Sequence, residues 1–137
     1  MKTKITLTII GTLQVLQAIL YSAFAKPAIE MMFNIGEEAT QLALMFQYAI
    51  SPAFLMIGLM LLFSRNTGVE NAKKLLLAII IAYMPLFMAF YCMSVSPMTN
   101  MGIGDFAVDI VMFGLAVFTY FKPVSYTHLT LPTNREV

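Results

Sequence analysis

Four long apolar segments, separated by short polar stretches, dominate the hydrophobic pattern of this chain. They cover residues 5–25, 41–63, 75–96 and 103–121. A helix needs about 20 apolar residues to cross a bilayer, and each segment comes close to that length. The segments are apolar nearly all round, unlike the one-sided stripe of a helix on a soluble protein. The pattern predicts an all-α integral membrane four-helix bundle over residues 1–123, with antiparallel sequential neighbours because the connections are short.

The positions of the basic residues predict the orientation of this bundle. Cytoplasmic loops carry an excess of Lys and Arg. With four spans, Lys26 would lie on the outer side, and the other basic residues of the bundle would share the inner side: Lys2, Lys4, Arg65, Lys73, Lys74 and Lys122. We therefore expect both termini in the cytoplasm and a multi-pass protein of the bacterial inner (plasma) membrane.

The first apolar segment also has features of a secretory signal. Two lysines precede an apolar run, and residues 23–25 read A-F-A, which fits an A-x-A cleavage site. The run is long for a signal core of roughly 7–15 residues, and Gln14 and Gln17 interrupt it. Retention of the first segment is the primary prediction. Cleavage, with a mature chain that starts at Lys26 and has three spans, stays open.

Composition and charge exclude several classes of protein. Of the 137 residues, 60% are hydrophobic and 11% are charged, and the net charge is +1. Ordinary soluble domains are about 25% charged, so these values argue against a soluble enzyme and against nucleic acid as a partner. The single cysteine, Cys92, and the single histidine, His128, exclude a disulfide framework and a Cys or His metal site within one chain. We expect no catalytic activity, no cofactor and no metal, and we interpret Cys92 as a small buried apolar residue.

The last residues differ abruptly in character from the rest. Residues 124–133 read VSYTHLTLPT, which resembles the translation of the transposon-end adapter used in shotgun sequencing, without a mismatch. We therefore interpret residues 124–137 as a non-native, adapter-derived tail; the alternative is a genuine short cytoplasmic tail. Whether the natural chain extends past Pro123 stays open.

Two acidic residues within the fourth segment are the main candidates for chemistry. Charged groups inside a membrane are costly and often functional. Asp109 lies nearest the middle of the segment, and Asp105 lies one helical turn earlier on the same face. Two nearby carboxylates repel when both are ionised, so one of them would hold a proton near neutral pH. In the alternative interpretation Asp105 caps the helix and Asp109 bonds to a neighbouring helix.

Other polar residues cluster toward the outer half of the predicted spans. Gln14, Gln17 and Tyr21 share one helix face. With the two aspartates, they predict a polar pocket open to the outside, to which further spans contribute Gln47, Tyr48 and Tyr91. We expect the acidic residues of the outer loop at its mouth: Glu30, Glu37 and Glu38. Simple solvation of these three glutamates is the alternative.

Two prolines lie inside predicted spans. Pro52 and Pro85 each remove a helix hydrogen bond, so we expect a kink at each. The kinks would be static or would act as hinges. Pro27 opens the outer loop, where we expect a short interfacial helix that ends at residues 34–36. The middle connection, SRNTGVENAKK over residues 64–74, predicts a polar turn.

Three features together resemble the small bacterial membrane proteins of the DoxX-like group. They are the Pro-led outer loop PAIEMMFNIG, a second span ending LMLLFSR, and a short basic loop before the third span. The resemblance implies a four-helix membrane architecture more than an activity. Two functions remain open. One is a structural or accessory subunit that partners other membrane proteins or a second copy within the lipid bilayer. The other is a small proton- or cation-coupled transporter or channel that uses Asp109 and Asp105.

Overall fold

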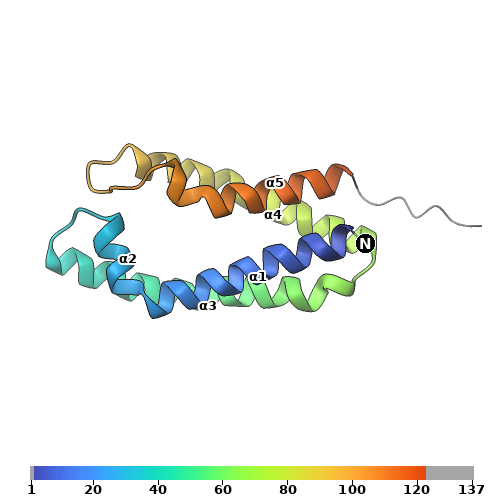
Figure 1. Cartoon of the computed structure of the whole chain (residues 1–137), viewed down its shortest axis with the longest axis horizontal. Helices are drawn as coiled ribbons and strands as arrows, with labels where there is room; N and C mark the ends of the chain where they lie inside the picture. The colour runs from blue at the N-terminus through green and yellow to red at the C-terminus, as the bar shows by residue number, and fades with distance from the viewer. Residues whose placement is uncertain (1, 123–137) are drawn as a thin grey trace, which may run out of the picture.

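The computed structural model describes residues 2–122 as a set of long helices joined by short connections (Figure 1). The elements are α1 (Lys2–Ala23), α2 (Ala25–Met32), α3 (Glu37–Phe63), η1 (Ser64–Asn66), α4 (Val69–Ser94), η2 (Ile103–Phe106) and α5 (Ala107–Phe121). Within the described residues, four helical segments are long and apolar enough to cross a membrane: α1, α3 with η1, α4, and η2 with α5. The prediction of four apolar, membrane-spanning helices is confirmed at this level of helix length and composition. The predicted tail, residues 124–137, lies outside the described residues.

A proline determines where the first long helix ends. The break falls at Phe24, whose backbone has φ −117° and ψ 28°. Pro27 has no N–H to bond the carbonyl of Ala23, which weakens the helix at this point. The helix α1 ends at Ala23 and α2 begins at Ala25, which places Pro27 in the first turn of α2. The short outer helix expected after the first span is present, and it begins two residues before the proline.

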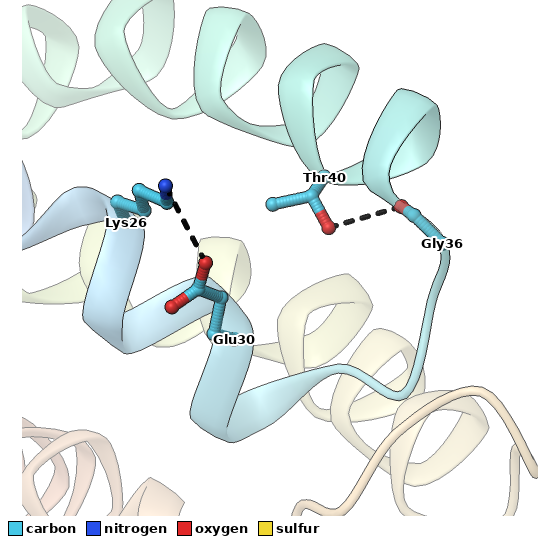
Figure 2. Close-up of polar contacts among 4 residues, drawn as sticks. All are labelled: Lys26, Glu30, Gly36 and Thr40. Atoms are coloured by element: carbon cyan, nitrogen blue, oxygen red, sulfur yellow. Dashed lines mark hydrogen bonds and ion pairs between the residues drawn. The ribbon is translucent and has the colours of Figure 1, made fainter.

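The second long helix begins earlier than the apolar pattern indicates. It starts at Glu37 rather than at residue 41. Glu37 and Glu38 lie in its first turn, where the positive end of the helix dipole stabilises negative charge. The Thr40 hydroxyl also donates a hydrogen bond to the Gly36 carbonyl at 3.0 Å (Figure 2). These polar contacts extend the helix beyond its apolar part.

The predicted polar turn over residues 64–74 is wrong over its second half. The helix α4 begins at Val69 and includes the polar stretch that precedes its apolar part. Glu70 and Lys74 are spaced i, i+4 on this first turn, and their charged groups lie 3.3 Å apart. Such pairs favour helix formation. The true connection is therefore only η1 and the two residues after it.

The long helices form two pairs, one of α1 with α3 and one of α4 with α5 (Figure 1). The first pair is packed tightly at two glycines. A Cβ atom at Gly11 would lie 2.9 Å from the Gly58 carbonyl oxygen, and one at Gly58 would lie 2.8 Å from the Gly11 carbonyl oxygen. The absence of side chains at both positions lets the two backbones touch, as small residues do in membrane helix pairs. Around Gly114 of α5, by contrast, no described atom beyond the adjacent residues and the nearby backbone of α5 lies within 4 Å of the position that a Cβ would occupy.

The core lies where α1 meets the other pair, and α1 contacts α3, α4 and α5. Its buried apolar side chains come from all four long helices: Leu7, Ile10, Leu61, Ala72, Leu76, Tyr83, Met112 and Ala116. Many large apolar side chains point outward instead; Phe63 is 80% exposed and Met45 is 70% exposed. Outward apolar side chains on long helices are expected where lipid, rather than water, surrounds the protein.

Contacts between distant segments hold both ends of the bundle. At the end that carries the chain start, the hydroxyls of Thr6 and Thr119 lie 2.7 Å apart between α1 and α5. At the other end, the connections on either side of the bundle form an isolated antiparallel bridge between Phe33 and Thr99. Its two backbone hydrogen bonds run from Asn34 N–H to the Met98 carbonyl and from Asn100 N–H to the Met32 carbonyl, each at 2.8 Å. A mature chain starting at Lys26 would lack α1 and the contacts that it makes.

Candidate intramembrane polar site

A part-buried polar contact between helices joins α4 to α5. The Tyr83 hydroxyl donates a hydrogen bond to Asp109 Oδ1 at 3.3 Å. Tyr83 is only 4% exposed, and Asp109 is half-buried. Asp109 also lies in the first turn of α5, because the α-helix begins only at Ala107. The positive end of the helix dipole therefore acts on this carboxyl group in addition to the tyrosine.

The two aspartates have different surroundings. Asp105 lies in η2 rather than in the α-helix and is exposed. Its Oδ2 accepts a hydrogen bond from the Gly102 backbone N–H at 2.7 Å, which caps the start of the segment. Asp105 therefore lies in a 3-10 turn that precedes α5, and the two aspartates do not belong to one continuous α-helix. Asp105 thus has the geometry of a cap, and Asp109 has that of an interhelical contact.

The glutamine face of α1 approaches the same region. Gln14 is 8% exposed, and its Nε2 donates to the Met112 sulfur of α5 at 3.8 Å. Gln17 lies beside the Asp109 carboxyl group and Tyr21. The Oε1 atoms of Gln14 and Gln17 are buried and have no hydrogen-bond partner among the described residues. An unpaired buried acceptor costs about 1–3 kcal/mol, so these two oxygens are unusual. We call Gln14, Gln17, Tyr83 and Asp109 the central polar cluster.

The remaining residues of the predicted pocket lie away from this cluster. Gln47 bonds within its own helix, where its Nε2 lies 3.5 Å from the Ser51 hydroxyl oxygen. Tyr48 is 55% exposed and Tyr91 is 66% exposed. The interpretation of Cys92 as a buried residue is wrong, since its side chain is exposed. The sequence placed these residues in the outer half of the spans, but it gave no information about which face they occupy.

Two of the three loop glutamates, Glu30 and Glu37, line a separate groove. This groove has a volume of about 500 Å³ and lies between α2 and α3, at the end of the bundle opposite to the chain start; Lys26 and Tyr48 also contribute to its wall. Glu30 Oε1 lies 3.8 Å from Lys26 Nζ, and both side chains are more than half exposed (Figure 2). Glu38 is exposed and is not part of the wall. The glutamates therefore do not surround the central polar cluster.

Both predicted prolines lie inside continuous helices. Pro52 is in α3 and Pro85 is in α4, and neither helix is interrupted. Next to Pro52, the buried Ser51 hydroxyl donates to the Gln47 carbonyl at 2.8 Å. Both proline side chains are exposed on the helix surface. Each proline thus leaves its helix intact while removing one backbone donor.

Sequence reasoning missed Tyr83, the partner of Asp109. Tyr83 lies within a long aliphatic stretch, LLLAIIIAYMPLF, which contains no other polar side chain that would indicate a site. One signal was available: an isolated tyrosine in such a stretch needs a partner for its hydroxyl. Tyr83 is also the centre of an aromatic group, with ring centroids 5.4 Å from Phe87 and 5.7 Å from Phe113. These rings fix the position of the hydroxyl that faces Asp109.

The acidic side chains of the described residues form no group that would hold a metal ion. No cluster of three or more His, Cys, Asp or Glu side chains occurs within residues 2–122. The chain was also compared with family models, curated proteins and solved structures, and no match was found in any of the three comparisons.

Proposed function

We propose that this chain is a structural or accessory subunit of the bacterial plasma membrane, with both termini in the cytoplasm and antiparallel neighbouring helices. The observation that carries the proposal is the hydrogen bond from Tyr83 to Asp109. A carrier of this size would place its aspartates toward a cavity shared by two copies. The carboxyl group of Asp109 is instead bonded inside one bundle. Its role as an interhelical contact fits a protein whose polar groups hold the fold together.

The placement of positive charge supports the proposed orientation. Arg65, Lys73 and Lys74 lie near one end of the bundle, in or next to the connection between α3 and α4. Thr6 of α1 and Thr119 of α5 meet at the same end as the chain start. Cytoplasmic loops are enriched in such basic residues.

Cysteine labelling tests this orientation. In a Cys92→Ser background, single cysteines are introduced at Thr67 and at Asn100 and treated in intact cells with a membrane-impermeant maleimide. We expect labelling of the Asn100→Cys variant only. Labelling of the Thr67→Cys variant only would contradict the proposed orientation and indicate the opposite one.

Proteoliposomes test the accessory role directly. Purified protein is reconstituted with a pH-sensitive dye inside the vesicles, and an imposed potential drives any proton or cation movement. An accessory subunit produces no flux above that of empty vesicles. In native membranes it migrates in a complex larger than a dimer of this chain. A flux that disappears in the Asp109→Asn variant would contradict the proposal.

A proton- or cation-coupled transporter is the second candidate, and one observation favours it. Gln17 Oε1 is buried, has no partner among residues 2–122, and belongs to a side chain next to Asp109. A protonated Asp109 has a donor to offer such an acceptor, whereas an ionised one does not. Proton binding at Asp109 would then change the contacts of α1. The flux measurement above separates this candidate from the first.

Membership of the DoxX-like group is part of the same proposal. It is supported by the Pro-led outer loop, which forms the short helix α2, and by the basic connection between α3 and α4. We propose no catalytic activity and no cofactor.

A further inference from the structure

We infer that the groove between α2 and α3 holds the head group of one phospholipid, a phosphatidylethanolamine, whose acyl chains continue along α3. The groove has a volume of about 500 Å³, which lies within the usual range for ligand sites. Its wall combines charged side chains of both signs with apolar ones. Such a lipid site is compatible with both candidate functions above, because it requires only that the long helices span a membrane.

The wall of this groove changes from charged to apolar along the axis of α3. Glu37 lies in the first turn of the helix, and Gln41, Met45 and Tyr48 follow on the same helix face. At about 1.5 Å per residue, the stretch from Glu37 to Tyr48 is about 16 Å long. Glu37 begins a segment long enough to cross a membrane, so it lies at the membrane surface and Tyr48 lies within the apolar layer. A ligand that fits both ends of the groove is an amphiphile.

A second groove, between α1 and α3, follows the first along α3 and has a volume of about 460 Å³. Pro52 and Leu55 line it, and they continue the helix face of Tyr48 at spacings of four and three residues. The hydroxyls of its two serines, Ser22 and Ser51, donate to carbonyls of their own helices. The remaining wall of the second groove is apolar, which suits an acyl chain.

The charges of the first groove fit a head group that has one positive and one negative end. Lys26 and Glu30 of α2 lie opposite Thr40 of α3 (Figure 2). The ion pair of Lys26 with Glu30 is long, at 3.8 Å, and exposed, so a ligand can replace it at little cost. Glu37 has no basic side chain within 4 Å among residues 2–122. Lys26 can therefore bind a phosphate, and the two glutamates can bind an ammonium group.

The two glutamates distinguish ethanolamine from other head groups. A primary ammonium has three N–H donors and forms charge-assisted hydrogen bonds to carboxylates. The trimethylammonium group of a phosphatidylcholine has no N–H donor, and aromatic cages are its usual sites. The groove has a single aromatic ring, that of Tyr48. A phosphatidylglycerol has a net negative charge, which the two carboxylates repel.

Three lipids with identical acyl chains test this choice. The purified full chain in a non-ionic detergent is titrated with phosphatidylethanolamine, phosphatidylcholine and phosphatidylglycerol, and bound lipid is counted by native mass spectrometry. We expect one site that binds phosphatidylethanolamine about tenfold more tightly than the other two, the equivalent of one hydrogen bond to a charged group. Equal binding of all three lipids, as in an unselective lipid shell, would overturn the inference, and so would a preference for another lipid.

A soluble probe tests the contribution of the acyl chains. Glycerophosphoethanolamine has the same head group without acyl chains. It should not bind at concentrations at which phosphatidylethanolamine saturates the site, because it cannot occupy the apolar part of the grooves. Equal affinity of the two compounds would show that the groove takes a soluble ligand, and the assignment to a lipid would be wrong.

Two neighbouring glutamates provide a matched pair of variants. Glu37→Gln removes a carboxylate from the wall and should abolish most of the preference for phosphatidylethanolamine. Glu38→Gln makes the same change of charge in the same helical turn, but Glu38 is not part of the wall, so the preference should remain. An unchanged preference in Glu37→Gln, or an equal loss in both variants, would contradict the proposed contact with the ammonium group.

A second pair of variants tests the contact with the phosphate. Lys26→Gln should weaken the binding of all three lipids, because each of them carries the phosphate. Lys74→Gln is the control, since it removes an exposed ion pair of the same i, i+4 spacing elsewhere in the chain. All four substituted side chains are exposed, so we expect unchanged helix content by circular dichroism. Unchanged lipid binding in Lys26→Gln would show that the phosphate lies outside this groove and would refute the assignment.

Discussion

Replacing Gly58 with alanine puts a methyl group into the contact between α1 and α3. Its Cβ would lie 2.8 Å from the Gly11 carbonyl oxygen, 2.8 Å from the Val15 backbone nitrogen and 2.7 Å from Val15 Cγ2. Two of these three atoms are backbone, so rotation of a side chain cannot relieve the overlap. The helices must move apart, and the surrounding contacts loosen with them.

Two opposing effects determine how much Gly58→Ala changes the free energy of unfolding. Overpacking of a well-packed contact costs about 1–3 kcal/mol. Alanine in place of glycine inside a helix favours folding by about 1 kcal/mol. The substitution Gly114→Ala carries the second effect without the first, because no described atom beyond the adjacent residues and the nearby backbone of α5 lies within 4 Å of the new Cβ. The difference between the two variants therefore isolates the packing cost, and we expect Gly58→Ala to be less stable than Gly114→Ala by about 1–3 kcal/mol.

Reversible unfolding in mixed micelles measures this difference. The purified variants are titrated with sodium dodecyl sulfate and followed by circular dichroism. The substitution Val15→Ala, added to Gly58→Ala, should restore only part of the lost stability, because it leaves both backbone contacts in place. Stabilities of Gly58→Ala and Gly114→Ala that agree within about 0.5 kcal/mol, the usual range for neutral surface changes, would refute the close contact of α1 and α3.

Three further contacts are tested by substitution in the same unfolding assay. The substitution Tyr83→Phe removes the donor to Asp109, and we expect a loss of about 1–2 kcal/mol, near the lower end for bonds to charged groups, because the bond is long at 3.3 Å; a neutral result in a cycle with Asp109→Asn would show that the pair contributes nothing. The substitution of both Thr6 and Thr119 by valine should lower the free energy of unfolding much less than either single change, since each single change leaves one buried hydroxyl without its partner. Losses that add up in the double variant would contradict this contact. The substitution Lys26→Gln should change stability by less than about 1 kcal/mol, because the ion pair with Glu30 is exposed. A larger loss would mean that the groove between α2 and α3 is more rigid than its exposure indicates.

The apolar pattern alone predicted some helix ends correctly and missed others. The fourth predicted segment, residues 103–121, has the bounds of the spanning unit η2 with α5. The apolar pattern did not distinguish the 3-10 turn that contains Asp105 from the α-helix that contains Asp109. The helices α3 and α4 begin earlier than predicted, at Glu37 and Val69. Acidic residues at the positive end of the helix dipole favour the extension of α3, and an i, i+4 ion pair favours that of α4. Apolar periodicity carries no signal for such extensions.

The candidate site was predictable only in part. Gln14, Gln17 and Asp109 could be chosen because polar groups inside apolar segments are costly and so are seldom incidental. No spacing in the sequence indicated that Tyr83 is the partner of Asp109, or that Glu30 and Glu37 line a groove of their own. A partner on another helix depends on how the two helices are rotated and paired, and the spacing within one helix says nothing about either.

The sequence by itself determined the number of long helices and their approximate extents. It could do so because the length of an apolar run must match the thickness of a bilayer, whatever the run packs against. The tertiary structure alone decided that α1 pairs with α3 through Gly11 and Gly58, and that Asp109 meets Tyr83. The physical reason is that lipid and protein interiors are similarly apolar. A helix that is apolar on every side carries no stripe to mark its buried face, and close packing and a few polar contacts select that face instead.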